Sequence, residues 1–209
     1  MPHSVHLFLE QVSHKLWDNA YFYLNGPHVM QGGPQAQQSQ VEKTGLDERT
    51  LAMRPFVDLQ LDHLAFPEYS DEFPHVPWTV GFAGRPGGPD FYINKVDNTA
   101  SHGPGGQYQH DLDEYADPCF AKVVDGFDTL QAMLQETTYS EGSDYAFFLE
   151  EPVQVVMALV TGSPKRIRAD LIATEASITG SANRKLTSGS RKRSPEKMAR
   201  PKIEHQVEP

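Results

Sequence analysis

The stretch WTVGFAGRPGGPDFYIN, residues 78–94, decides the fold of this chain. It begins with aromatic and β-branched residues at 78–80 and ends with a second apolar run at 91–93, and both runs favour β-strands. Between them, glycine stands at 81, 84, 87 and 88 and proline at 86 and 89, which is typical of a tight loop. The stretch predicts two strands joined by a rigid surface loop that another backbone can approach closely, as the wall of a groove would require.

A second stretch of the same character lies upstream, at residues 21–33, YFYLNGPHVMQGG. It predicts a strand, a turn at Asn25-Gly26-Pro27, a second short strand and a break at Gly32-Gly33. A third stretch, DPCFAKVVDGFD at 117–128, predicts a strand over 120–124 and a helix over 126–135. The chain therefore has a series of short strands with few helices.

Together the three stretches resemble the cyclophilins, the peptidyl-prolyl cis-trans isomerases. Met30-Gln31-Gly32-Gly33 is similar to the family's Gln-Gly-Gly strand end, and residues 88–93 are similar to its Gly-Ser-Gln-Phe-Phe-Ile run. Residues 117–128 look like its Phe-Gly-Lys-Val strand with the helix that follows. The three matches occur in the family's order and cover about residues 4–160. The resemblance implies a mainly β fold, a cyclophilin-like antiparallel β-barrel with two flanking helices, over residues 1–161.

The remaining segments complete this expectation. Ser4–Trp17 has helical spacing of apolar residues at 5, 8, 9, 12 and 16, with Ser4 as N-cap. Loops are expected over 34–50, 70–77 and 95–117, short strand or turn pieces over 51–69, and strands over 145–149 and 153–160. Cyclophilins place two strands before the first helix, and here only three residues precede it. Two explanations stay open: the sequence begins inside a longer chain, which we favour, or this version has lost part of the fold.

The resemblance also implies a site, when the family's positions are carried over one by one. The family's catalytic arginine falls on Tyr23, so a neutral hydroxyl stands in place of a charged guanidinium with several N–H donors. The family's glutamine is kept as Gln31. The other positions are implied to bind substrate: His28 and Val29 for the family's Phe-Met pair, Gly81 and Phe82 for its Ala-Asn pair, Asp90 for the loop glutamine, Tyr92 for the pocket phenylalanine, Asp117 for the histidine, and Leu112 for the tryptophan.

Two functions remain open on these residues. The first is a peptidyl-prolyl isomerase whose activity is weakened by Tyr23, and the second is an inactive module that binds proline-containing peptides or proteins. Neither needs a cofactor. The residues His102, His110, Asp111 and Asp113 have no standard zinc or calcium spacing, so we expect a solvated loop and no metal there. Cys119 has no second cysteine to pair with and is expected to be a small buried strand residue.

Charge divides the chain into two parts. Residues 1–161 carry 7 Lys and Arg against 23 Asp and Glu, a net charge of −16, and residues 162–209 carry 11 against 5, a net charge of +6. An acidic body disfavours nucleic-acid binding, whereas the Gly-, Ser- and Lys/Arg-rich tail is expected to be disordered. Its Arg191-Lys192-Arg193 run suits a nuclear address or contact with acidic partners. We expect a monomer without a membrane span, in the cytoplasm or nucleus.

Overall fold

The computed structural model describes residues 1–36, 38–106, 116–140 and 147–159. The basic tail predicted over 162–209 lies outside these residues, as does Leu112. In the described part, no helix combines the length and apolarity needed to cross a membrane.

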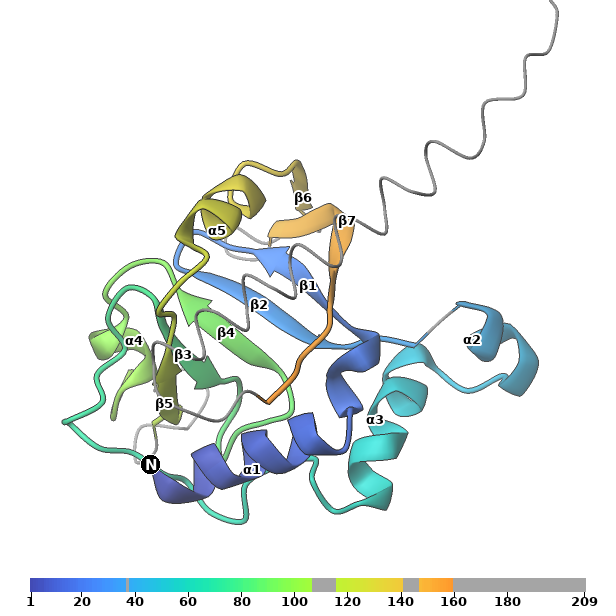
Figure 1. Cartoon of the computed structure of the whole chain (residues 1–209), viewed down its shortest axis with the longest axis horizontal. Helices are drawn as coiled ribbons and strands as arrows, with labels where there is room; N and C mark the ends of the chain where they lie inside the picture. Colours follow the sequence, from blue (N-terminus) through green and yellow to red (C-terminus); the bar gives the residue numbers. More distant parts are fainter. Residues whose placement is uncertain (37, 107–115, 141–146, 160–209) are drawn as a thin grey trace, which may run out of the picture. The chain divides into compact units, whose positions relative to one another are not determined.

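The described residues form one seven-stranded sheet in which every neighbouring pair is antiparallel. The strand order is β5-β3-β4-β2-β1-β7-β6, and Figure 1 shows the central strands side by side. The strands are β1 (Ala20–Asn25), β2 (Val29–Pro34), β3 (Thr79–Phe82), β4 (Phe91–Asn94), β5 (Cys119–Lys122), β6 (Thr138–Ser140) and β7 (Phe147–Val155). The predicted mainly β, antiparallel fold is confirmed.

Both stretches that decided the prediction form antiparallel pairs of strands. Strand β1 pairs with β2 across the turn at Asn25-Gly26-Pro27, and β3 pairs with β4 across the Gly/Pro loop. Strand β2 runs through Gly32 and Gly33 to Pro34, so the predicted break at the two glycines is wrong. An added Cβ at Gly32 would lie 3.1 Å from the Tyr21 carbonyl oxygen, and at this position glycine permits close strand contact.

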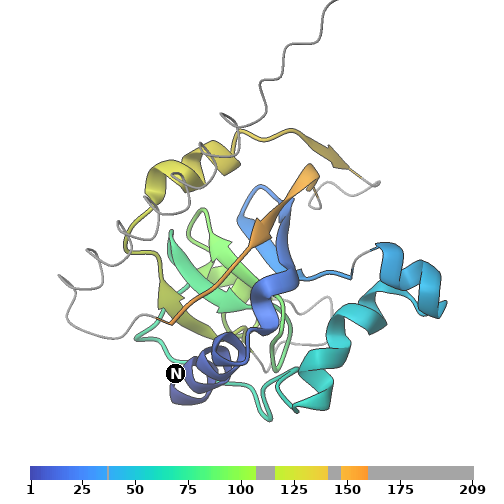
Figure 2. The same cartoon turned by 45° about the vertical axis from the view of Figure 1, so that its right-hand side comes forward.

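One face of the sheet carries the core, and the other carries polar groups. Side chains alternate between the faces along a strand, and on the core face Phe82, Phe91 and Phe120 pack together. Helix α1 (Pro2–Ser13) covers one end of this face, and helix α5 (Phe127–Met133) covers the other with Leu130, which packs on Met30 and Ile93. These are the two flanking helices that the resemblance implied, and Figure 2 shows the sheet curving around its inner side.

Helix α1 buries the predicted face only in part, since Phe8, Val12 and Leu16 pack on the core. Ser4, Leu7 and Val12 are buried, whereas Val5 and Leu9 remain 38% and 43% exposed. Ser4 is not the N-cap, since the helix begins at Pro2. Its hydroxyl instead donates to Glu68 Oε2 at 2.6 Å, which satisfies a buried polar group. The helix ends before Trp17, which lies in a 3-10 turn (Leu16–Asn19) and is fully buried.

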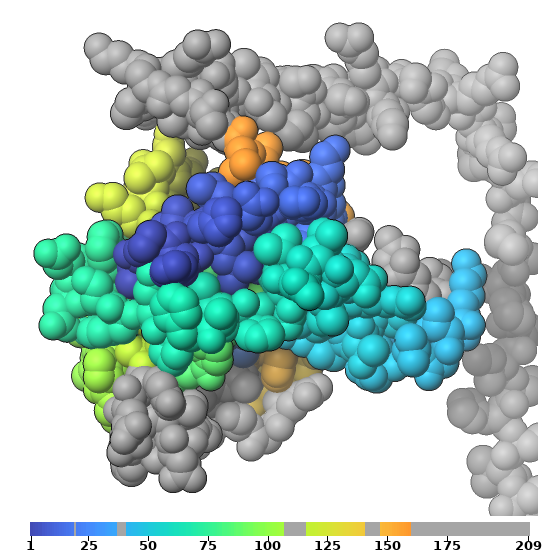
Figure 3. Space-filling view, turned by 90° about the horizontal axis from the view of Figure 1, so that it is seen from below, coloured from blue at the N-terminus to red at the C-terminus, as the bar shows by residue number. Residues whose placement is uncertain are grey.

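Three helices lie where loops or strand pieces were expected, and those predictions are wrong. They are α2 (Gln38–Thr44), α3 (Glu48–Asp58) and the short α4 (Thr99–His102). Helix α3 is stabilised at its start by Asp47, whose carboxylate accepts from the Thr50 N–H at 2.9 Å. It buries Phe56 in the same core as α1, and Figure 3 shows α1 and α3 next to each other on one face.

The last strands also differ from the prediction. Strand β6 was not expected, and the two strands expected over 145–149 and 153–160 are one strand, β7, with Pro152 inside it. Proline lacks the N–H that a sheet ladder needs. No ladder partner is formed between Phe148 and Val153 on the β1 side, so the proline stands where the pairing is interrupted.

The Gly/Pro loop between β3 and β4 is held by its own chain. The Gly87 carbonyl accepts from the Leu64 N–H at 3.0 Å, and Pro89 is fully buried. An added Cβ at Gly88 would lie 3.4 Å from the Asp62 carbonyl oxygen. The glycines do admit a neighbouring backbone, as predicted, but it is the segment after α3 that comes close.

Candidate functional site

A β-bulge places Tyr23 at the centre of the candidate site. Phe22 pairs with Gly32 and Leu24 with Gln31, so Tyr23 has no partner in β2. The same residue is passed over in the pairing with β7, where Phe22 faces Val153 and Leu24 faces Phe148. An extra residue in a strand bends it and redirects a side chain, and bulges are frequent next to active sites.

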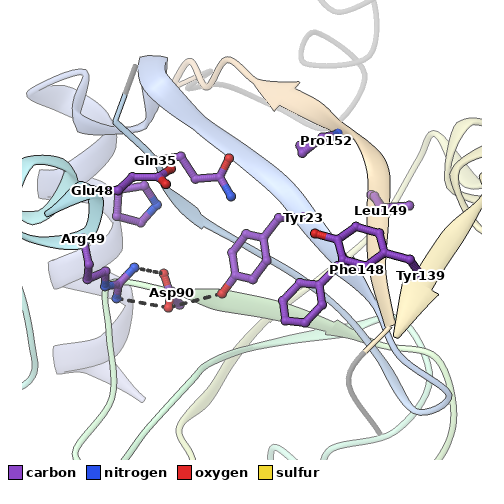
Figure 4. A pocket seen from close by; sticks show the side chains of 10 residues that line it. Tyr23, Gln35, Glu48, Arg49, Asp90, Tyr139, Phe148, Leu149 and Pro152 are labelled. Atoms are coloured by element: carbon purple, nitrogen blue, oxygen red, sulfur yellow. Dashed lines mark hydrogen bonds and ion pairs between the residues drawn. The ribbon is translucent and has the colours of Figure 1, made fainter. Parts of the chain in front are cut away.

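Tyr23 is one member of a hydrogen-bonded chain of four side chains, and Figure 4 shows three of them, Tyr23, Asp90 and Arg49. Gln31 Nε2 donates to the Tyr23 hydroxyl at 2.7 Å, and that hydroxyl donates to Asp90 Oδ2 at 3.4 Å. Arg49 then donates to both carboxylate oxygens of Asp90, at 3.0 and 3.1 Å. Burial, followed by the negative charge of Asp90, raises the pKa of Tyr23, so the phenol stays protonated and can act only as a neutral group.

Tyr23, Asp90 and Arg49 line a pocket of about 460 Å³. Its walls come from five elements and their flanks, and the lining residues are Tyr23, Pro34, Gln35, Glu48, Arg49, Asp90, Tyr139, Phe148, Leu149 and Pro152. The ring of Phe148 stacks beside Tyr23 with centroids 6.5 Å apart. Figure 4 shows Arg49 and Asp90 on one side of Tyr23 and Phe148 with Tyr139 on the other. The pocket thus joins an aromatic wall to a charged one.

A second polar cluster lies at Asp117, next to β5. Its carboxylate accepts from Arg85 Nε at 2.8 Å and from the Tyr92 hydroxyl at 3.2 Å, and it contacts His102 Nδ1. The side chains of Arg85 and Asp117 are 0% and 3% exposed. Buried charges need such partners because the loss of hydration is costly. The cluster therefore fills the space over this part of the sheet.

Two further histidines border this cluster. His75 is fully buried, and its Nε2 donates to the Asp117 carbonyl oxygen at 3.0 Å while its Nδ1 lies 3.3 Å from the Tyr92 hydroxyl. Burial lowers the pKa of His75. Burial also lowers the pKa of His28, with smaller effects from His102 and Lys95. The ring centroids of His28 and His102 are 5.6 Å apart.

The implied site residues that the structure describes fall into three groups: those at the Tyr23 pocket, those buried or half-buried elsewhere, and a pair inside the sheet. Tyr23 and Asp90 line the pocket described above, and Gln31 is hydrogen-bonded to Tyr23. Val29, Tyr92 and Asp117 are 4%, 1% and 2% exposed, and His28 is intermediate.

The pair Gly81 and Phe82 lies inside the sheet. Phe82 packs in the core, stacked on Phe120 with centroids 4.5 Å apart, and its N–H donates to the Pro118 carbonyl oxygen. Gly81 pairs with Tyr92 on one side and Cys119 on the other. Since β3 has a neighbour on each side, these backbone groups have no open edge to offer a peptide.

Sequence reasoning missed three residues of the site: Arg49, Arg85 and His75. Arg49 had a detectable signal, since Asp47 followed by Thr50 and the apolar residues 51, 52 and 56 is the start pattern of a helix. Arg85 and His75 had none, because their partner Asp117 is 32 and 42 residues away in the chain.

No group of three or more His, Cys, Asp or Glu residues in the described ranges is arranged to hold a metal ion. His102 is buried in contact with Asp117 and not on a solvated loop, so that expectation is wrong for this residue. His110, Asp111 and Asp113 lie outside the described residues. Cys119 is buried, and burial raises the pKa of its thiol, which disfavours the reactive thiolate.

The fold and the site define a mainly β protein with a half-aromatic, half-charged pocket at a bulge in its antiparallel sheet.

No protein-family model and no curated protein matches the chain. Among solved structures, a cyclophilin-type peptidyl-prolyl cis-trans isomerase of Cryptosporidium parvum is similar at 16% identity with a TM-score of 0.43. The similarity covers 76% of this chain and 87% of the isomerase in its structure with the dipeptide Ala-Pro. In a further structure of that isomerase it covers 76% and 86% at the same identity and TM-score.

Proposed function

We propose that this chain is a cyclophilin-type peptidyl-prolyl cis-trans isomerase of weak activity, acting on X-Pro bonds in the pocket around Tyr23. The observation that carries the proposal is the meeting of Tyr23, Gln31 and Asp90, three positions that the sequence resemblance selected independently, in one hydrogen-bonded group. The three sequence motifs in family order support the reaction class.

The reaction needs a donor and a dry surface, not a covalent step. The barrier to rotation about the peptide bond is about 18–20 kcal/mol because of amide resonance. A donor that stabilises the twisted amide lowers this barrier by electrostatic preorganisation. Among the described residues, the Tyr23 hydroxyl proton is held by a 3.4 Å contact to Asp90, longer than the usual O–H···O distance, so a peptide acceptor can replace Asp90. Phe148, stacked beside Tyr23, supplies an apolar surface for a proline ring.

Activity is expected to be weak because the donor is neutral. A charged hydrogen bond is roughly twice as strong as a neutral one, and burial keeps the Tyr23 phenol from changing its charge at ordinary pH. The enzyme would therefore bind X-Pro peptides and accelerate their isomerisation only modestly.

The test is NMR exchange spectroscopy on a short peptide with one X-Pro bond, with and without the folded protein. We expect faster exchange with the protein, and a loss of most of that increase in Tyr23→Phe, which removes only the hydroxyl. Tyr21→Phe is the matched control, because Tyr21 lies on the same strand but outside the pocket lining. Unchanged exchange with folded wild-type protein would contradict the proposal.

A second candidate, a peptide-binding module without turnover, is favoured by one observation. Val29, Tyr92 and Asp117, which the resemblance assigns to the proline pocket, are almost fully buried. The proline would then have no separate pocket at these positions, and binding would rest on the groups around Tyr23. Shifts of the protein amide signals on addition of the peptide, with no change in the peptide's exchange rate, would select this function over the first.

A further inference from the structure

Arg49 lies on helix α3 and reaches the pocket from there, whereas Tyr23 and Phe148 lie on strands of the sheet. It lies in the first turn of α3, where the Asp47 cap fixes the start of the helix. Its two terminal nitrogens donate to the two oxygens of Asp90. This fork-to-fork geometry orients a guanidinium more strictly than a single contact would. The orientation of Arg49 over the pocket is therefore set by Asp90.

The helix by itself does not account for a cation at this position. A positive charge in the first turn is disfavoured by the helix dipole. The side chains of Arg49 and Asp90 are 51% and 16% exposed, so water partly screens the pair on the arginine side. Residues 1–161 also contain only 7 basic residues against 23 acidic ones, so one that lines the pocket is not explained by abundance.

We propose that Arg49 is the cationic substrate-binding group of this pocket, and that it donates to a backbone carbonyl oxygen of the bound X-Pro peptide. Asp90 is its positioning residue. This inference rests on the proposed function and names the charged donor that Tyr23 lacks. The guanidinium has five N–H donors in a rigid fork, and Figure 4 shows it on the same side of Tyr23 as Asp90, whose carboxylate lies between the two side chains. A peptide seated against Tyr23 and Phe148 thus comes within reach of Arg49.

The test compares Arg49→Gln, Arg49→Lys and Arg54→Gln in the NMR exchange assay and in a peptide titration. Arg54 is the matched control, because it lies on the same helix, is 67% exposed and lines no part of this pocket. We expect Arg49→Gln to lose tenfold or more in kcat/KM, Arg49→Lys to lose less because it keeps the charge without the fork, and Arg54→Gln to match wild type.

The role of Asp90 has its own readout. Asp90→Asn removes the carboxylate and is expected to raise KM more than it changes kcat, because the guanidinium loses its orientation. Asp90→Glu, which restores a carboxylate, should recover part of the loss, and a merely structural residue would not show this pattern.

The outcomes separate this inference from the function beneath it. If wild type binds or isomerises the peptide and Arg49→Gln behaves like Arg54→Gln, the role of Arg49 is overturned and the proposed function stands. If folded wild type neither binds nor isomerises the peptide, the proposed function fails and the role of Arg49 fails with it.

Discussion

Removing the charge of Asp117, next to β5, should strongly destabilise the fold. The substitution Asp117→Asn keeps the size of the side chain but leaves the guanidinium of Arg85, 0% exposed, without its carboxylate partner. Breaking a buried ion pair on one side costs about 3–5 kcal/mol, and the His102 and Gly103 carbonyl oxygens that accept from Arg85 Nη2 at 3.3 and 3.4 Å carry no negative charge to replace that of Asp117. Domains of this kind have a total stability of about 5–15 kcal/mol, so the variant should lose a large share of its stability.

The loss can be measured by urea denaturation followed by circular dichroism. With a slope of about 2 kcal/mol per molar urea, the midpoint should fall by roughly 1.5–2.5 M. Asp58→Asn is the matched control, since the Arg54–Asp58 pair is 67% and 68% exposed and should contribute less than about 1 kcal/mol. If Asp117→Asn also cost less than about 1 kcal/mol, the reasoning on the buried pair would be refuted.

Three further predictions concern the same core and sheet. The pKa of His75 is lowered by burial, so the unfolded chain binds a proton at this residue more readily than the folded one. The free energy of unfolding should therefore fall as pH drops below about 6.5, by at most about 1.4 kcal/mol per pH unit. A higher free energy of unfolding at pH 5.5 than at pH 7.5, measured by urea denaturation, would contradict this. Gly81→Ala would place a Cβ 2.7 Å from the buried Tyr92 ring and 3.0 Å from the Pro118 carbonyl oxygen, and should lower stability by about 1–3 kcal/mol, seen as a lower melting temperature. Trp17→Ala should cost about 3–5 kcal/mol by calorimetry, because the indole is 0% exposed and packs on Phe56 and Phe91; a loss below about 1 kcal/mol would contradict that packing.

The strands could be predicted from the sequence where the pattern was local. The runs at 78–94 and 21–33 combine strand-forming residues with turn residues at short spacing, and both formed hairpins as expected. The expectation of short strand or turn pieces over 51–69 missed helix α3, in which Pro55 lies, although the capping pattern at Asp47 is present in the sequence. Proline is tolerated there because tertiary burial of Phe56 outweighs local propensity.

The site could be predicted only in part, because its geometry depends on contacts between residues far apart in the chain. Tyr23, Gln31 and Asp90 were selected by family position, but no local pattern indicates that Tyr23 is left out of the pairing with both neighbouring strands. A bulge depends on the register of three strands at once. The burial of Asp117 likewise depends on Arg85, which sequence reasoning had placed in a loop without a role.

The bulge at Tyr23 has a consequence for how such a site can arise and disappear in evolution. Phe22 and Leu24 already face consecutive residues of β2, Gly32 and Gln31. Deleting the single codon for Tyr23 would therefore leave the β1–β2 pairing in register while removing the hydroxyl from the pocket. In a lineage of related chains, the gain or loss of one codon at this position would switch the pocket chemistry without requiring a new sheet.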